Sequence, residues 1–522
     1  MASDKIPVAV DFVIRAFSGT GITEYASGIF NGIIQKLGDV LEVTQRPSID
    51  VFGDAESASG LNDRGRGIYY WEHNNTLYFV EDDTVYRDDY STTVGTISSG
   101  TERVEFHEAN VSGGGEVLII TDAENNNAFK ITTANVFSSH SPTNFPTTLC
   151  QGGAVLDGYL FLMDEDGIIY NSAVGDVDTF PAAGFITAER NHDKGVYLGR
   201  HRESVVALGT RTIEFFYDAA NSVGSPLNRR ADIFHNIGCA DGVSVWENGD
   251  IIYFVGSDPS GSLGVYKIEN YNVTKVSTDT IDSYINHNIT QESFRMVGSG
   301  LNAQGHLVYT LTLYNLPGAA STSPISPEIT LSFDTFAKLW GVWSTTINGH
   351  TTFPLVSWTK RTGGFNESVR ARAGEGILTN GDLITLGDNM VPIDTILGFT
   401  GYFVSGYIDS TYFVAAAPDV TSNVALKVRT GMYDGGINKL KFQNSIKPTY
   451  DETPTSQTLT LQWSTSAEQE GTFTTGRSLD TSKRDIARRG GKFTRRNYQL
   501  SYSGDEQLYL QDLDIDVNIG DY

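Results

Sequence analysis

The residues most able to do chemistry by their types and spacing lie in a basic run near the C-terminus, KRDIARRGGKFTRR, residues 483–496. It holds seven basic side chains and one acidic side chain, in a chain whose formal net charge is -26. Guanidinium and ammonium groups bind phosphates and carboxylates, so the run is a candidate contact for either. The alternative is a solvated loop or an intersubunit salt-bridge strip. The candidate residues are Lys483, Arg484, Arg488, Arg489, Lys492, Arg495 and Arg496.

Two glycines inside this basic run determine how it is expected to fold. Gly490 and Gly491 follow Arg489, and glycine lets the backbone bend freely. The run is therefore predicted to be a hairpin tip that becomes ordered on assembly. Its cations are expected to lie against the carboxylates of a neighbouring protein or against the phosphates of DNA. Of these two partners, we favour the neighbouring protein, a subunit or the adaptor.

Two other segments, MDEDG at 163–167 and DAENNN at 122–127, are rich in carboxylates and amides. A calcium loop of the EF-hand type needs ligands at alternate positions over about twelve residues and a final Glu. Neither segment supplies that pattern. Because Asp, Asn and Gly tolerate positive φ, both segments are predicted to be hairpin turns.

The composition predicts an all-β protein. The 522 residues include 54 glycines, 25 tyrosines and 27 phenylalanines but only 15 prolines, which is typical of many strands joined by tight turns. Membrane insertion is not expected, because every long apolar stretch is interrupted by polar residues. The start of the chain lacks the features of a signal peptide, so synthesis in the cytosol is expected. The strong negative charge opposes sequence-specific DNA binding.

Between residues 67 and 389 one pattern recurs: a strand, a turn rich in Asp, Asn and Gly, a second strand and a looser connection. The recurrence, roughly every 40 to 50 residues, is the period of propeller blades. We therefore predict a six- or seven-bladed β-propeller at residues 64–392. Residues 1–63 are expected to wrap or close the ring. The alternating strands of residues 393–522 are predicted to form a C-terminal β-sandwich.

Three local predictions follow from shorter segments. The stretch GTRTIEFFYD at 209–218 alternates as a strand does, and its Glu214 is expected to be solvated rather than catalytic. Apolar residues at helical spacing behind a Ser/Thr/Asp start predict a short helix within 277–295. Prolines at 316–327 indicate a loop inserted in a blade, because proline cannot join a sheet ladder.

Catalytic and metal-binding patterns are absent from the sequence. The nine histidines show no HxH or HExxH spacing, and Cys150 and Cys239 lack a CxxC partner, so two core thiols and neither metal nor cofactor are predicted. A sialidase-type propeller would need clustered arginines, a tyrosine nucleophile and paired carboxylates on the ring axis. Its repeated Ser-x-Asp-x-Gly-x-x-Trp turn is only faintly echoed at 463–473. We therefore predict that the protein is not an enzyme.

Several segments, in the same order along the chain, resemble the packaged-DNA stabilisation proteins, or tail hub (nozzle) proteins, of short-tailed phages. The most similar block is residues 209–256, with a TIE-plus-aromatics strand, a variable loop, a Gly-Cys turn and a Tyr/Phe strand. Further similar segments are QRPSI at 45–49, GVYKIENYNVTKVSTDTIDSYI at 264–285, FDTFAKLWGVWS at 333–344, LTLQWSTSAEQEGTF at 459–473 and RRNYQLSY at 495–502.

The resemblance implies a structural virion protein, made in the host cytoplasm and located in the phage tail. Such proteins form a hexameric ring below the head-to-tail adaptor, extend the DNA channel and help to hold the packaged double-stranded DNA. They also carry tail fibres or spikes and a needle or plug. The rival interpretations of this sequence are a propeller adhesin that binds glycans and a sialidase-like glycan hydrolase.

The charge of the chain fits a conduit for DNA. An acidic wall repeated around a ring repels phosphate evenly instead of trapping it at sites. The same charge makes self-association repulsive, so the isolated chain is expected to be monomeric or weakly associated and to form its sixfold ring on a template. In that setting the basic run would contact a neighbouring subunit or the adaptor in preference to DNA.

Overall fold

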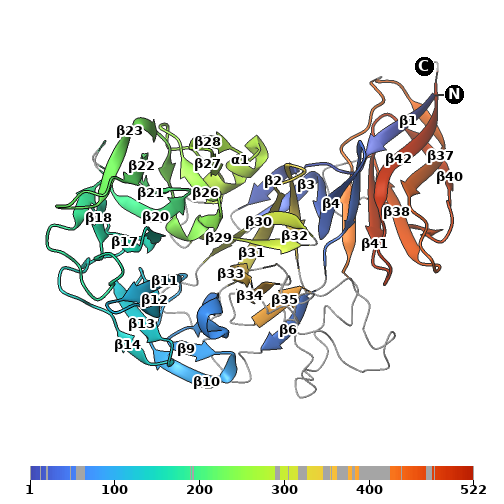
Figure 1. Ribbon diagram of the computed structural model, residues 1–522. Helices are drawn as coiled ribbons and strands as arrows, with labels where there is room; N and C mark the ends of the chain where they lie inside the picture. The colour runs from blue at the N-terminus through green and yellow to red at the C-terminus, as the bar shows by residue number, and fades with distance from the viewer. Residues whose placement is uncertain are drawn as a thin grey trace.

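The computed structural model describes most of the chain, and strands dominate it (Figure 1). The helical elements of the described residues are α1 (Asp279–Asn288), η2 (Glu72–Asn74) and η3 (Gly242–Ser244). The strands form eight sheets. The described residues are 2–11, 13–18, 21–47, 49–53, 65–188, 190, 193–288, 294–303, 305–315, 326–344, 353, 355–360, 374–378, 383–386, 424–436, 438–465, 473–474 and 476–520.

Seven groups of strands follow one another around a ring, which fills the left and centre of Figure 1. The first group is β7 (Gly65–Trp71), β8 (Thr76–Glu81), β9 (Thr84–Arg87) and β10 (Asp89–Thr96). The second is β11 (Glu105–Val111), β12 (Gly115–Asp122), β13 (Asn127–Thr132) and β14 (Phe137–Ser139). The third is β16 (Ala154–Leu156), β17 (Tyr159–Met163), β18 (Ile168–Asn171) and β19 (Phe185–Thr187).

The remaining groups complete the ring. The fourth is β15 (Gln151–Gly152), β20 (Gly195–His201), β21 (Ser204–Gly209), β22 (Ile213–Asp218) and β23 (Leu227–His235). The fifth is β24 (Gly238–Cys239), β25 (Trp246–Asn248), β26 (Ile251–Ser257), β27 (Leu263–Glu269) and β28 (Asn272–Lys275). The sixth is β29 (Phe294–Ala303), β30 (His306–Asn315), β31 (Ser326–Asp334) and β32 (Leu339–Trp343). The seventh is β33 (Leu355–Lys360), β34 (Gly374–Leu378), β35 (Leu383–Leu386) and β6 (Ile49–Gly53).

Successive groups contact one another, and the seventh contacts the first through β33 and β7. The outer strand of the seventh group, β6, comes from the N-terminal part of the chain. It pairs antiparallel with β35, with Gly53 opposite Leu383 and Ile49 opposite Leu386. Early and late segments of the chain are thus joined in one sheet, which makes the ring's closure depend on a contact between residues more than 300 positions apart.

The second strands of these groups are apolar on both faces because a neighbouring sheet packs on each side of them. In β12 every residue of the run VLII at 117–120 is buried, and β8 and β21 are buried along nearly their whole lengths. In a strand with one solvated face, buried apolar and exposed polar residues would alternate instead. The continuous apolar runs therefore reflect face-to-face packing of sheets around the ring.

Strands from both ends of the chain form two further sheets beside the ring, at the right of Figure 1, and the second of these is continuous with the sheet of the sixth group, so that the total is eight. One contains β1 (Ala2–Pro7), β4 (Gly32–Leu37), β5 (Val40–Gln45), β37 (Lys441–Tyr450), β40 (Ala487–Phe493) and β42 (Leu510–Ile519). The other contains β2 (Val13–Ser18), β3 (Gly21–Phe30), β36 (Leu426–Arg429), β38 (Thr458–Ser464), β39 (Arg477–Asp480) and β41 (Asn497–Tyr502).

The two further sheets share one hydrophobic core and are attached to the ring. The core includes Leu459 and Leu500 from one sheet and Ile446, Leu513 and Ile515 from the other. The sheet containing β3 continues into the sixth group of the ring, because Phe30 of β3 pairs with Val342 of β32. The N-terminal strands therefore bind the C-terminal sheets to the ring.

The all-β class is confirmed, and so is the helix predicted within 277–295, which is α1. Hairpin turns between β12 and β13 and between β17 and β18 confirm the interpretation of the two carboxylate-rich segments. The predicted loop at 316–327 is too long. Its residues 316–325 lie outside the described residues, while Pro327 is in β31 and pairs with Tyr314 beside a register shift. An irregular position of this kind tolerates the missing N–H of proline.

Candidate functional site

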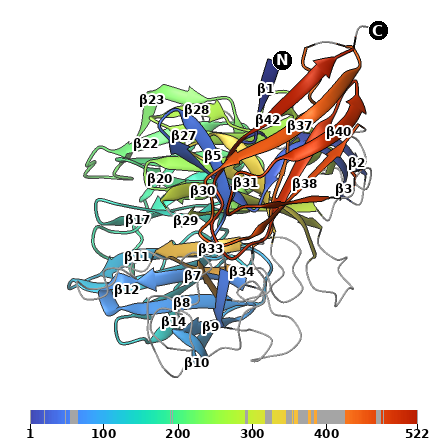
Figure 2. The same cartoon turned by 90° about the vertical axis from the view of Figure 1, so that its right-hand side faces the viewer.

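The basic run predicted from the sequence lies in and beside β40, at the edge of its sheet (Figure 2). β40 pairs antiparallel with β37, so that Lys492 is opposite Phe442 and Arg488 is opposite Ser445. Between these pairs the register shifts at Gln443, and Arg489 and Gly491 adopt φ of 62° and 78°. The expectation of a hairpin tip is therefore wrong: the two glycines permit a bulge within an edge strand.

Arg496 departs from the expected exposed strip because it is buried, with 3% exposure. Its Nη1 donates to the Gly490 carbonyl oxygen at 2.7 Å and to Gln443 Oε1, and its guanidinium lies over the ring of Phe493 at 4.2 Å. Burial lowers its pKa. Arg496 thus ties the end of the basic run to β37 and β40 from inside the domain.

The other six basic residues of the run are exposed. Lys483 and Arg484 have carboxylate partners nearby, with Lys483 Nζ 3.0 Å from Asp480 Oδ2 and Arg484 Nε 3.5 Å from Glu452 Oε1. No ion pair joins the remaining four to any carboxylate of the described residues. These four residues, which we call the β40 cations, are Arg488, Arg489, Lys492 and Arg495.

A further arginine belongs to this surface, although it lies outside the run. Arg477 of β39 donates through Nη1 to the Arg488 carbonyl oxygen and through Nη2 to that of Arg489 at 3.4 Å. Its guanidinium lies over the ring of Trp463 at 5.2 Å. Nothing in its local sequence, GRSLD, marks Arg477 as part of the basic surface, because the contact forms only when the two sheets pack.

A second candidate site lies inside the ring, where sequence reasoning expected none. Arg103 stands just before β11 and has 7% exposure. Its guanidinium donates to the carbonyl oxygens of Gly298 at 2.7 Å and Val245 at 2.9 Å, and its Nε donates to Glu105 Oε1 at 2.8 Å. Arg103 therefore joins the second strand group to the fifth and sixth groups across the ring.

The backbones of the fifth and sixth groups approach each other closely at this point. A Cβ added at Gly298 would lie 1.9 Å from the carbonyl oxygen of Ser244 in η3. The same oxygen accepts a hydrogen bond of 2.9 Å from the Tyr309 hydroxyl. Asp241 holds the start of η3 by accepting from the Val243 N–H at 2.9 Å. Backbone atoms and buried side chains thus fill this part of the ring.

Carboxyl and phenol groups surround Arg103. Desolvation, and next the nearby charge of Glu105, raise the pKa of Glu247 to about 8. Burial, and next the charge of Glu247, raise the pKa of Tyr197 well above its ordinary value. Burial also raises the pKa of the Asp241 carboxyl. At neutral pH the site therefore favours the protonated forms of Glu247 and Tyr197.

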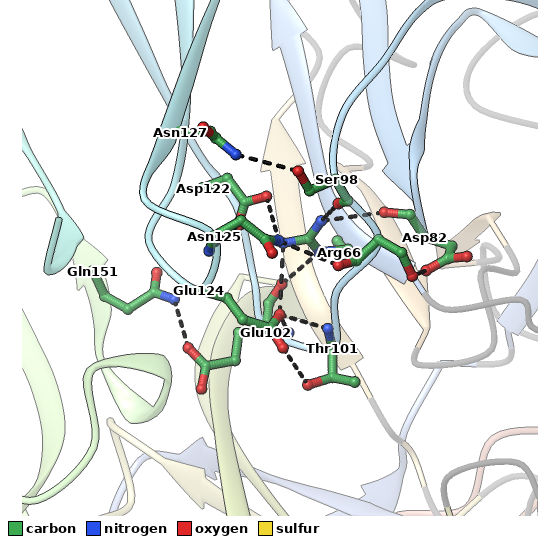
Figure 3. Close-up of polar contacts among 11 residues, drawn as sticks. Arg66, Asp82, Ser98, Thr101, Glu102, Asp122, Glu124, Asn125, Asn127 and Gln151 are labelled. Atoms are coloured by element: carbon green, nitrogen blue, oxygen red, sulfur yellow. Dashed lines mark hydrogen bonds and ion pairs between the residues drawn. The ribbon is translucent and has the colours of Figure 1, made fainter. Parts of the chain in front are cut away.

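A third group of polar contacts borders this site and is drawn in Figure 3. Arg66 of β7 is fully buried and donates to Asp122 Oδ1 at 2.7 Å, to the Ser98 carbonyl oxygen at 2.9 Å and to that of Glu102 at 2.9 Å. Glu124 accepts from the backbone N–H groups of Thr101 and Glu102. These bonds hold the connection from β10 to β11 against the turn after β12, and so fix the position of Arg103.

The ring site contains an arginine, a tyrosine and carboxyl groups, the residue types that a sialidase-like hydrolase would need. Their burial, protonation and hydrogen bonds do not suit that chemistry. Tyr197 has 5% exposure and its pKa is raised, whereas a phenol nucleophile needs activation. The guanidinium of Arg103 is engaged by backbone carbonyls and Glu105. These contacts fit a cross-link within the ring better than a place for substrate.

Two other expectations concern single residues. Glu214 is not solvated: its exposure is 2%, and its Oε2 lies 2.7 Å from Arg229 Nε. It also accepts from the Arg190 N–H at 2.9 Å. The segment is a strand, β22, as predicted, but Glu214 is buried because both faces of this strand are covered at that position. The expectation of two core thiols is confirmed, since Cys150 and Cys239 are free and buried.

No group of three or more His, Cys, Asp or Glu residues in the described part of the chain is placed to hold a metal ion. Among the same residues, no helix has the length and apolar character needed to cross a membrane.

Residues 44–316 match a protein family whose description is "Bacteriophage P22 Gp10, beta-propeller". The match spans more than half of the chain and includes the first five strand groups of the ring. The chain belongs to this family. The resemblance noted from the sequence is thereby confirmed, and the protein is a structural component of a phage tail with a β-propeller.

No curated protein matches the chain. Among solved structures, a streptogramin B lyase is 11% identical, covers 65% of this chain and 96% of its own, and has a TM-score of 0.37. A catalytically inactive virginiamycin B lyase from Staphylococcus aureus is 8% identical, with 65% and 98% covered and a TM-score of 0.38. The N-terminal domain of Nup159 is 8% identical, with 69% and 99% covered and a TM-score of 0.36. Likenesses this distant carry no inference about activity.

Proposed function

We propose that this protein is the tail hub, or nozzle, of a short-tailed phage. In this role it forms a hexameric ring below the head-to-tail adaptor, extends the DNA channel, helps to retain the packaged genome and carries fibres or spikes and a plug. The observation that carries the proposal is the family match over residues 44–316. The function is non-enzymatic and belongs to the virion.

The proposal assigns a structural role to each part of the chain. We take the seven strand groups to be the blades of a seven-bladed propeller, with β6 closing the last blade. The two sheets beside the ring, with their shared core, are taken as a C-terminal β-sandwich to which the N-terminal strands are added. This assignment keeps the predicted divisions near residues 63 and 392 as domain boundaries, while strands from residues 1–63 take part in both domains.

The ring site bears on where DNA would pass. Arg103, Gly298 and Ser244 bring three strand groups into contact inside the ring of a single chain. The major groove of a DNA duplex is by itself about 12 Å wide, so a duplex cannot pass where protein backbones touch. The channel would therefore be enclosed by several chains and not by one propeller. A wall with a net charge of -26 per chain would repel phosphate along that path.

The test uses the phage that encodes the chain. A stop codon in the gene, read through only in a suppressor host, gives particles without the protein. These particles are expected to package DNA and then to lose it, so that nuclease removes the DNA, and adding the purified protein should restore nuclease protection. Particles that retain their genomes and infect without the protein would contradict the proposal.

The two rival functions have their own readouts. Turnover of a glycan by the purified protein, abolished by Glu247→Gln or Glu105→Gln, would replace the structural role by a hydrolase. Binding of host glycans by the chain, with normal tails and retained DNA in its absence, would identify an adhesin. The structural role predicts neither result.

A further inference from the structure

The β40 cations form a surface whose positive charge the described residues leave uncompensated. Arg488, Arg489, Lys492 and Arg495 are exposed, and none lies within ion-pair distance of a carboxylate in the described parts of the chain. Three of these charges lie in the edge strand β40 and Arg495 follows two residues after its end, so their potentials add. An anionic surface brought against them would gain interaction energy without displacing an existing partner.

The layer beneath these cations is also positively charged. The buried guanidinium of Arg496 donates to amide and carbonyl oxygens, and its Nε has no hydrogen-bond partner in the described residues. Lys441, which is 1% exposed, donates to the carbonyl oxygens of Thr494 at 3.2 Å and Lys439 at 3.1 Å. Water screens buried charges less than exposed ones, so this layer strengthens the potential at the surface.

Apolar side chains stand beside the β40 cations. Phe442 of β37 is 45% exposed and lies opposite Lys492. Ile519 is 48% exposed and lies one strand further from β40, at the end of β42, which pairs with β37. Exposed aromatic residues combined with arginine are the composition of protein interfaces. A surface for sliding DNA would have no use for the apolar groups. The composition therefore favours a protein partner.

The edge of β40 is not open for strand addition along its whole length. The side chain of Arg477 bonds the carbonyl oxygens of Arg488 and Arg489, which an added strand would need as acceptors. A partner would therefore be held by the side chains of the β40 cations and the adjacent apolar groups, and not by a continued sheet.

We propose that the β40 cations dock onto an acidic face of a second copy of this chain. The rest of the chain is more negative than the net charge of -26, because the basic run offsets part of that charge. Two copies cannot meet with the β40 cations of one against those of the other, since like charges would face each other. The cations therefore contact a different surface of the second copy, and in the proposed ring this contact repeats head to tail. This deepens the proposed ring function by naming one half of the subunit interface.

The test measures self-association of the purified full-length chain by sedimentation equilibrium at low salt, about 0.05 M. One variant changes Arg488, Arg489, Lys492 and Arg495 to Ser. A matched control changes the exposed residues Lys194, Arg200, Arg202 and Arg211 to Ser. Both variants remove three arginines and one lysine, and each includes one residue with positive φ, Arg489 or Arg202. Circular dichroism and thermal unfolding confirm that both are folded.

Without a template the wild type is expected to associate weakly. The β40 variant is expected to associate at least about tenfold more weakly than the wild type, and the control to stay within about twofold of the wild type. Raising the salt to about 0.5 M should remove the difference between the β40 variant and the wild type. An equal mixture of wild type and β40 variant should still form mixed pairs within about twofold of the wild-type constant, because the variant keeps its acidic face. A two-fold symmetric contact uses the β40 cations of both copies, so its mixed pairs would be intermediate in strength between wild-type pairs and variant pairs.

Three outcomes would overturn the proposal. One is equal association of the wild type and the β40 variant, including the case in which neither associates. Another is an equal loss in the matched control, which would show a general charge effect. The third is loss of binding to a short DNA duplex in the β40 variant with unchanged self-association, which would assign the surface to DNA. None of these results depends on the particle experiment, so failure of the tail-hub function and failure of this interface are distinguishable.

Discussion

Arg103 and Gly298, which are 195 positions apart in the chain, are joined by a hydrogen bond of 2.7 Å from the arginine guanidinium to the glycine carbonyl oxygen. The same guanidinium reaches Val245, so one side chain connects three of the seven strand groups. Other contacts around the ring join mainly successive groups. Arg103 therefore adds a brace across the ring, and the first two predictions concern this brace.

Replacing Arg103 by Met should destabilise the protein by about 3 kcal/mol, because two buried carbonyl oxygens lose their donor and the partly buried Glu105 loses its ion-pair partner. The matched control is Arg484→Met, which removes an exposed ion pair of 3.5 Å and should cost at most about 1 kcal/mol. Urea midpoints at pH 7 measure both changes. Equal midpoints for the two variants would show that the brace does not stabilise the ring.

Gly298→Ala should be strongly destabilising, because its Cβ would lie 1.9 Å from a backbone oxygen that cannot move without shifting η3. We expect a loss of about 3 kcal/mol or more, or failure to accumulate as folded protein. Gly431→Ala is the control, since nothing lies within 4 Å of a Cβ added there. The thermal midpoints and soluble yields of the two variants should therefore differ widely. Similar values would refute the close approach.

The raised pKa of Glu247 predicts a dependence of stability on pH. The folded-state pKa is about 8 and the ordinary value is 4.5, so between these values the folded protein holds a proton that the unfolded chain releases. This group's contribution is therefore full below pH 4.5 and falls as the pH rises toward 8, by at most about 1.4 kcal/mol per pH unit. Glu247→Gln should flatten that decline and be more stable than the wild type at about pH 9. Thermal midpoints measured from pH 5 to 9 test this, and parallel curves for the two proteins would contradict it.

Arg495 and Arg496 are adjacent in sequence, but the same substitution is expected to change the free energy of unfolding much more at Arg496 than at Arg495. Arg496→Met should cost about 2 kcal/mol or more, because it leaves Gln443 and the Gly490 carbonyl oxygen without their buried donor. Arg495→Met should change the free energy of unfolding by less than about 0.5 kcal/mol, since the side chain is exposed. Chemical unfolding of the two variants measures the difference. A loss at Arg495 as large as that at Arg496 would show that the exposed part of the run is also structural.

Local chemistry made several features predictable. Helical spacing of Ile281, Tyr284 and Ile285 gives α1, and all three residues are fully buried. Asp- and Asn-rich segments form hairpin turns because these residues tolerate the required backbone angles. The recurring strands also suffice for the all-β class. Each of these properties depends on residues a few positions apart, which the sequence displays directly.

The candidate sites could not be predicted in the same way. Arg103 and Glu247 are separated by more than a hundred residues, and their neighbourhood arises only when the ring closes. The charged segment TERVE at 101–105 was the available signal, but a charged segment before a strand is usually a solvated turn. Arg477 joins the basic surface for a similar reason, because two sheets must pack before its guanidinium reaches β40.

The sequence by itself determined the class of the fold, its turns and its family, because strand periodicity, turn chemistry and family motifs are encoded in neighbouring residues. Only the tertiary structure decided which charges are buried and which strands are edges. Glu214 and Arg496 were expected to be exposed, yet both are buried. The pairing of distant strands determines which side chains of a sheet are covered by other parts of the chain. The strand β6 likewise pairs with β35 only through folding of the whole chain. The sequence could not show these features because strand pairing between distant residues leaves no pattern in neighbouring residues.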